Sequence, residues 1–172
     1  MVLMTLENLN RLPTRDALAA LERCCGSSVW IEQMCAKRPY SDVAHLMSAA
    51  ERAADGLVPA DWREAFAHHP RIGDATALRE RFAATARWAG DEQRGATGAA
   101  EEVIEALARG NHAYEERFGH TFIVCATGRT AAEMLALLEA RMDHTPDVEL
   151  AVAAGEQRKI TRLRLEKLLA EA

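Results

Sequence analysis

The sequence predicts an all-α protein: a single-domain, irregular helical bundle of about eight or nine helices that spans residues 1–172. Apolar residues recur at steps of three and four through most of the chain, as in helices with one buried face. Prolines and capping side chains stand where these repeats begin. Only residues 121–126 have the composition of a strand, and one such segment cannot form a sheet. Because the helices are short and unequal, an irregular bundle is favoured over a regular four-helix bundle.

The first part of the chain predicts three short helices. The leucines of residues 6–12 recur at helical spacing. Thr14 can cap a second helix, which we expect Gly26 to close. Ser27 or Ser28 then caps a third helix, because each places a hydroxyl directly before an apolar helical repeat.

Two further helices lead to a pair of histidines. Pro39 ends the third helix, and we expect Ser41 to open a fourth that stops at residues 55–56, an Asp-Gly pair. The next helix runs over residues 59–67 with proline at its start. It delivers residues 68–69, both histidine, at its end.

The second half of the chain predicts four helices and one connector. A helix over residues 78–88 precedes three glycines. Each glycine costs roughly 1 kcal/mol relative to alanine, so we expect a break or a close approach within residues 89–98. A long apolar stripe, 103–118, follows and ends at a glycine. Residues 121–126 are expected to cross the core as an extended connector.

The last two helices have clear start signals. Residues 130–133 read Thr-Ala-Ala-Glu, which is a capping box. Pro146 is expected at the first turn of the final helix, which runs to about Ala170.

The composition excludes several classes of partner. The formal net charge is −5, and no basic face is interleaved with aromatic residues, so we expect no nucleic-acid partner. No apolar run has the length of a membrane span, and the start lacks the pattern of a signal peptide, so we expect no membrane association and a cytoplasmic location. The 4 cysteines show no metal-ligand spacing and are expected to be reduced and mostly buried.

Residues 68–74 have the sequence His-His-Pro-Arg-Ile-Gly-Asp. We expect them to form a tight loop that carries several ionisable side chains. Pro70 restricts the backbone of His69, so this side chain is presented from a fixed position. Rigid loops often carry catalytic groups. The alternative is an ordinary helix C-terminus with basic side chains near its last carbonyls.

Arg164 shares a helical stripe with Ile160 and Leu168, whereas Arg162 lies off this stripe. A buried arginine needs an anionic partner. Two partners stay open on the residues alone: an internal carboxylate such as Glu92, or the carboxylate or oxyanion of a substrate.

Five segments, in their order and spacing, resemble a known family, the 2-oxo-4-hydroxy-4-carboxy-5-ureidoimidazoline (OHCU) decarboxylases of urate degradation. The segments are 69–73, 88–93, 111–119, 122–124 and 160–165. The resemblance covers nearly the whole chain. It implies an all-α carboxy-lyase, a homodimer that needs neither metal nor organic cofactor and that converts a small-molecule ureidoimidazoline carboxylate to S-allantoin.

The resemblance also implies the site. It assigns catalytic roles to His69, Glu92 and Arg164, with the arginine anchoring the substrate. It assigns Pro70 to the same loop and places the substrate against the backbone of residues 122–124, that is Phe122, Ile123 and Val124. It also assigns position 89 to the site. Many relatives have serine there, and this chain has Ala89, so one hydroxyl contact is absent or supplied elsewhere.

The residue types suit this chemistry. As the family implies, the substrate carries its carboxylate next to a C=N bond, which can accept the electrons released with CO₂, so no cofactor is needed as an electron sink. A histidine with a pKa of about 6.5 suits proton delivery at neutral pH. A glutamate can orient the histidine or bind the ureido N–H groups, and an arginine can donate paired hydrogen bonds to an oxygen.

Two other functions compete with this one. The first is a non-catalytic all-α interaction domain, which predicts no cavity joining His69, Glu92 and Arg164. The second is a metal-dependent hydrolase using His68, His69 and Glu92. The absence of a helical His-x-x-x-His spacing argues against the hydrolase.

Overall fold

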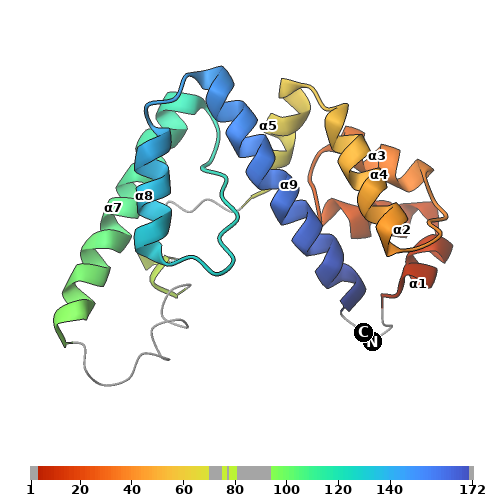
Figure 1. The fold of residues 1–172 in the computed structure, drawn as a ribbon, viewed down its shortest axis with the longest axis horizontal. Helices are drawn as coiled ribbons and strands as arrows, with labels where there is room; N and C mark the ends of the chain where they lie inside the picture. Colours follow the sequence, from red (N-terminus) through yellow and green to blue (C-terminus); the bar gives the residue numbers. More distant parts are fainter. Residues whose placement is uncertain (1–3, 70–74, 77, 81–93, 171–172) are drawn as a thin grey trace. The chain divides into compact units, whose positions relative to one another are not determined.

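A computed structural model describes residues 4–69, 75–76, 78–80 and 94–170 (Figure 1). These residues form helices and connecting segments without any strand, so the predicted all-α fold is confirmed. The helices are α1 (Leu6–Arg11), α2 (Thr14–Glu22), α3 (Ser28–Ala36), α4 (Val43–Asp55), α5 (Pro59–Ala67), α7 (Arg94–Phe118), α8 (Ala131–Arg141) and α9 (Pro146–Ala170). Residues 75–76 and 78–80 are helical as well.

The chain divides into two compact units. The first comprises residues 1–68 and 154–172, and the second comprises residues 69–153. Helix α9 is common to both, since residues 146–153 belong to the second unit and residues 154–170 to the first. Whether the two units fold as one domain stays a prediction.

Two predicted helix starts in the first unit are wrong by one residue. Pro13, not Thr14, is the N-cap of α2, because the Pro13 carbonyl already accepts hydrogen bonds from first-turn N–H groups and Thr14 is helical. Asp42, not Ser41, caps α4, because the Asp42 carboxylate accepts the His45 N–H at 2.7 Å. A carboxylate also favours the positive end of the helix dipole more than a hydroxyl does.

Of three other helix ends in this unit, two are as predicted and one is not. Ser27 caps α3 by accepting the Trp30 N–H, and α5 begins at Pro59. The predicted closure of α2 at Gly26 is wrong, because α2 already ends at Glu22. Both residues between Arg23 and Gly26 are buried cysteines, and their burial continues the core beyond the end of the helix.

The core of the first unit is built around Trp30. This side chain is 1% exposed, and its indole N–H donates to the Ala50 carbonyl of α4 at 3.1 Å. The buried N–H thus has the partner that burial requires. Other fully buried side chains of this core come from α1, α2, α3, α4 and α5, namely Leu9, Leu21, Met34, Leu46 and Phe66.

Helices α7 and α8 lie side by side in the second unit (Figure 1). Gly110 of α7 permits this close packing, because a Cβ added there would lie 2.8 Å from a methyl group of Leu138 in α8. Helix α7 begins at Arg94 and includes both Gly95 and Gly98, so the helix does not break at these two glycines. Residues 89–93, the other part of the segment in which a break or close approach is predicted, lie outside the described residues. Alanine, the best helix former, surrounds these glycines and offsets their propensity cost.

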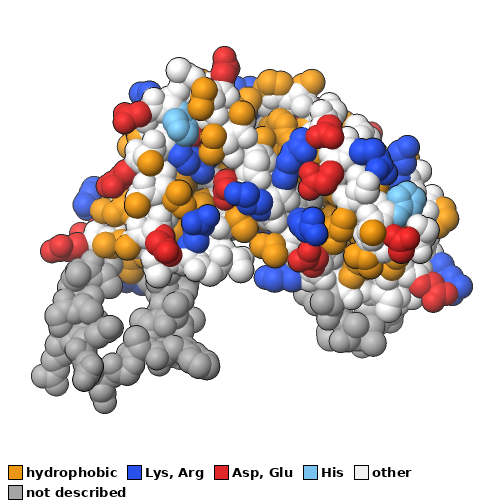
Figure 2. Space-filling view, viewed as in Figure 1, with side chains coloured by type: hydrophobic (Ala, Val, Ile, Leu, Met, Phe, Trp, Pro, Cys, Tyr) orange, Lys and Arg blue, Asp and Glu red, His pale blue; other side chains and the backbone are white. Residues whose placement is uncertain are grey.

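Residues 121–126 are neither helix nor strand, which confirms the predicted connector. Phe122 and Ile123 are each 1% exposed, so the connector is held by core packing. Gly119, with φ 73°, ends α7 ahead of it. The surface face in Figure 2 shows basic and acidic side chains interspersed with apolar ones, in keeping with the mixed charge of the sequence.

Candidate active site

The structure describes some of the predicted site residues and not others. His69, Arg164 and the three residues Phe122, Ile123 and Val124 lie within the described residues. Pro70, Ala89 and Glu92 lie outside them. Because His69 belongs to the second unit and Arg164 to the first, the convergence of His69, Glu92 and Arg164 on one cavity stays a prediction.

The two adjacent histidines have different surroundings. His68 is the C-cap of α5, and its N–H donates to the Ala65 carbonyl at 3.3 Å. Its ring packs against Gly26, where an added Cβ would lie 2.3 Å from the His68 Cγ. His69 lies beyond the helix and is half-buried, whereas His68 is exposed. From the sequence, Pro70 is expected to fix the backbone of His69, and this residue does lie just beyond α5.

Arg164 lies at the border of the buried face of α9. That face consists of Gln157, Thr161, Leu165 and Leu168, and Arg164 beside them is half-buried. Its Nη1 donates to the Arg23 carbonyl at 3.4 Å. Among the described residues no carboxylate pairs with Arg164, and Glu92, the internal partner considered above, is outside them.

Two neighbouring arginines of α9 have acidic partners, whereas Arg164 has none among the described residues. Arg162 is exposed and pairs with Glu166 at 3.2 Å, which confirms that it lies off the stripe. Arg158 pairs with both Glu51 and Asp55, at 3.2 and 2.8 Å. Arg164 instead lines a pocket of about 230 Å³ with Arg23, Cys24, Lys167 and Leu168.

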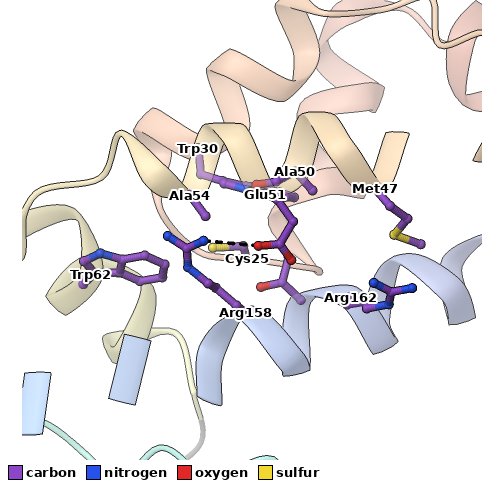
Figure 3. A pocket seen from close by; sticks show the side chains of 10 residues that line it. Cys25, Trp30, Met47, Ala50, Glu51, Ala54, Trp62, Arg158 and Arg162 are labelled. Carbon is purple, nitrogen blue, oxygen red and sulfur yellow. Dashed lines mark hydrogen bonds and ion pairs between the residues drawn. The ribbon is translucent and has the colours of Figure 1, made fainter. Parts of the chain in front are cut away.

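A second, much smaller pocket lies between α3, α4, α5 and α9 (Figure 3). Its volume of about 20 Å³ accommodates no more than a water molecule. Arg158 points across it toward Glu51, and its guanidinium lies over the Trp62 ring at 5.7 Å. These paired charges make it a packing feature of the first unit rather than a substrate site.

The connector is fixed by a buried arginine that the sequence reasoning missed. Arg141 Nη1 donates to the Ile123 carbonyl at 2.8 Å. Arg141 also binds Glu149 through Nε at 2.8 Å, and the side chains of the two residues are 7% and 0% exposed. Tyr114 donates its hydroxyl to the same carboxylate, and His144 Nδ1 lies 2.7 Å from its other oxygen. One sequence signal could have indicated this ion pair: an arginine stands in the last turn of α8 and a glutamate in the first turn of α9.

This cluster keeps its carboxylate ionised. Burial raises the pKa of Glu149, but hydrogen bonds from Arg141, Tyr114 and His144 outweigh it and hold the pKa below its ordinary value. The pKa of Tyr114 is raised, first by burial and then by its hydrogen bond to Glu149, so its phenol stays protonated and acts as a donor. One backbone carbonyl of the candidate substrate-lining segment is therefore held by a permanent ion pair.

Within the described residues, no group of three or more His, Cys, Asp or Glu side chains could hold a metal ion. The metal-hydrolase alternative depends on Glu92, which these residues do not include. None of the described helices is long and apolar enough to cross a membrane.

Comparison with known proteins identifies the family. The sequence model of OHCU decarboxylase matches residues 10–166. The uric acid degradation bifunctional protein TTL of Arabidopsis thaliana is 36% identical over 148 residues, which cover 86% of this chain. This chain spans only 46% of that bifunctional protein. The 2-oxo-4-hydroxy-4-carboxy-5-ureidoimidazoline decarboxylase of Haloferax volcanii is 29% identical over 94% of both chains.

Solved structures agree. A crystal structure of OHCU decarboxylase in the presence of (S)-allantoin is 35% identical, with a TM-score of 0.68, and the match covers 87% of this chain and 96% of that chain. A crystal structure of (S)-allantoin synthase, at 20% identity, shares the fold with the same TM-score of 0.68 over 96% of this chain and 54% of that one. The matched family model spans nearly the whole chain, so this protein belongs to the OHCU decarboxylase family.

Proposed function

We propose that this chain is a carboxy-lyase of urate degradation that converts 2-oxo-4-hydroxy-4-carboxy-5-ureidoimidazoline to S-allantoin. The observation that carries the proposal is the match of the family model to residues 10–166. The 35% identity to an OHCU decarboxylase crystallised in the presence of (S)-allantoin supports the same product.

The reaction replaces CO₂ by a proton. The bond to the carboxylate breaks and CO₂ leaves. The electron pair of that bond forms a C=C bond to the neighbouring carbon, and the nitrogen of the former C=N bond takes up a proton. The resulting enol then gains a proton on that neighbouring carbon and loses its hydroxyl proton to give a carbonyl. The protein must orient the carboxylate, stabilise the developing charge and deliver the proton to one face of the intermediate.

His69, Glu92 and Arg164 are proposed for these tasks. His69, beyond the end of α5 and half-buried, delivers the proton. Glu92 orients His69 or accepts hydrogen bonds from the ureido N–H groups of the substrate. Arg164 binds a substrate oxygen, and its half-buried position in the lining of a pocket supports this role. Pro70, Ala89 and the backbone of Phe122, Ile123 and Val124 line the substrate.

The proposal also covers cofactors, assembly, location and partners. The substrate holds its own electron sink, so activity needs neither metal nor organic cofactor. The active form is a homodimer, and the protein acts in the cytoplasm on a small-molecule substrate, without nucleic acid or membrane partners. Sedimentation at several protein concentrations tests the dimer directly.

The function is tested by generating the substrate from urate with urate oxidase and hydroxyisourate hydrolase. Adding this protein should accelerate the decay of the ureidoimidazoline in proportion to protein concentration. A decay rate that is independent of the protein would favour the alternative, a non-catalytic all-α interaction domain.

A further inference from the structure

The pocket beside Arg164 contains more positive charge than the proposed site uses. Arg23 follows the end of α2, and Arg164 and Lys167 come from α9, all within the first unit. Cys24 and Leu168 form the buried apolar part of the lining, at 1% and 5% exposure. None of the described residues that line the pocket is acidic. Its volume of about 230 Å³ is suited to a small metabolite.

Within the described part of the chain, the three cations of this pocket have no carboxylate partner, unlike two neighbouring cations of α9. Lys159 pairs with Glu156, and Arg162 pairs with Glu166. Among the described residues, by contrast, neither Arg23, Arg164 nor Lys167 pairs with a carboxylate. A cluster of unpaired cations raises the local concentration of small anions, and here it does so on a chain whose net charge is −5.

The thiol in the pocket does not neutralise this charge. Burial raises the pKa of Cys24 to about 11, although Arg164 and Arg23 act in the opposite direction. Cys24 is therefore neutral at physiological pH, and the positive charge of the pocket is available to a ligand.

The geometry also orients Arg164. Its Nη1 donates to the backbone carbonyl of Arg23 at 3.4 Å, a contact between residues far apart in the sequence. The carbonyl holds one edge of the guanidinium, and a guanidinium has five N–H donors in a fixed fork. The remaining donors can bind the two oxygens of a carboxylate.

We propose that Arg23 and Lys167 complete an anion-binding pocket around Arg164 that receives the carboxylate of the substrate. This proposal rests on the proposed function and adds two binding residues to it. Arg164 makes the directed contact, and Arg23 and Lys167, both exposed, add electrostatic attraction. The substrate class is thus a small monocarboxylate, not an uncharged ureide.

The two exposed cations should affect binding more than chemistry. Charge pairs at exposed positions are weak, so removing either cation should raise KM on the order of two- to fivefold. Neither residue is assigned to proton transfer, so kcat should change little. Exposed charges are screened by salt, so the wild-type KM should rise with ionic strength, and this dependence should flatten in the double variant.

The experiment compares Arg23→Gln, Lys167→Gln and the double variant with wild type in the coupled assay, from low to high salt. Substitution of Arg23 removes its guanidinium but keeps the backbone carbonyl that holds Arg164. Arg162→Gln and Lys159→Gln are matched controls, because each removes one positive charge from α9 at a cation that already has an acidic partner.

The expected result is a higher KM and a weaker salt dependence in the pocket variants, with both controls unchanged. Equal KM and salt dependence in pocket and control variants, with an active wild type, would overturn the pocket and leave the proposed function standing. A wild-type protein without activity would instead refute the proposed function.

Discussion

At the scale of the residue, two adjacent histidines have different surroundings. His68 belongs to the end of α5 and packs on Gly26, whereas His69 lies beyond the helix and is half-buried. This difference was predictable, because Pro70 marks the helix end in the sequence. The surroundings of Arg164 were not, since Arg23 approaches it only through the tertiary fold.

His69→Ala should lose most of the acceleration, whereas His68→Ala should be much milder. A positioned acid–base group contributes on the order of 10²- to 10⁴-fold, and that is the loss expected at His69. The coupled assay gives both rates, with circular dichroism in the far ultraviolet confirming that each variant is folded. Equal losses in the two variants would mean that the proton comes from another residue.

At the scale of the element, the Arg141–Glu149 pair joins the end of α8 to the start of α9 and to the connector. Glu149 of α9 also accepts a hydrogen bond from the Tyr114 hydroxyl of α7. Its carboxylate therefore links α7, α8 and α9. The folded-state pKa of Glu149 lies below its ordinary value of 4.5. Its contribution to stability is therefore present above the unfolded-state pKa and is lost as pH falls through the folded-state pKa.

Glu149→Gln should lower the free energy of unfolding at neutral pH by about 3–5 kcal/mol, because it leaves the buried charge of Arg141 uncompensated. It should also weaken the decline of stability with acidification. Urea unfolding at pH 7 and at stepwise lower pH measures both effects. Glu166→Gln, which breaks an exposed pair, is the control and should change little. A neutral-pH stability equal to wild type would show that the pair is not structural.

Two glycines in long helices allow the effect of packing on stability to be measured apart from the effect of helix propensity. Gly155 in α9 has no described atom within 4 Å of an added Cβ, whereas Gly110 in α7 has Leu138 at 2.8 Å. Gly155→Ala should therefore stabilise the protein by up to about 1 kcal/mol. Gly110→Ala should gain less or be destabilising, because α8 must shift. Thermal unfolding compares the two, and equal stabilisation would contradict the close packing of α7 on α8.

The helices were largely predictable because their start signals are local. Pro59, Pro146 and the capping box at residues 130–133 all begin helices as expected. The errors occurred where two local signals compete. Asp42 outcompetes Ser41 as a cap, and the alanines near Gly98 outweigh its breaking tendency. The Arg141 cluster was missed because its partners meet only in the folded unit.

At the scale of the whole molecule, the chain is a member of the OHCU decarboxylase family, and the groups proposed for its chemistry are far apart in the sequence. Family segments near residues 69 and 164 stand in different compact units. The sequence order of the segments identified the family, but no sequence pattern could reveal the additional cations of the Arg164 pocket.

Activity should survive exhaustive dialysis against a chelator, because the substrate itself accepts the electrons released with CO₂. The measurement is the decay rate of the ureidoimidazoline before and after dialysis, with substrate generated beforehand so that the auxiliary enzymes play no part. Loss of activity that zinc restores would contradict cofactor-independence and support a metal-dependent reaction.

The central claim is stereospecific decarboxylation, and the circular dichroism of the allantoin product tests it most directly. The free substrate decays to racemic allantoin, as the family's chemistry implies, so any optical signal reports enzymatic protonation of one face. With substrate generated from urate, increasing amounts of this protein should give an increasing excess of S-allantoin. Racemic allantoin at every protein concentration would contradict the account.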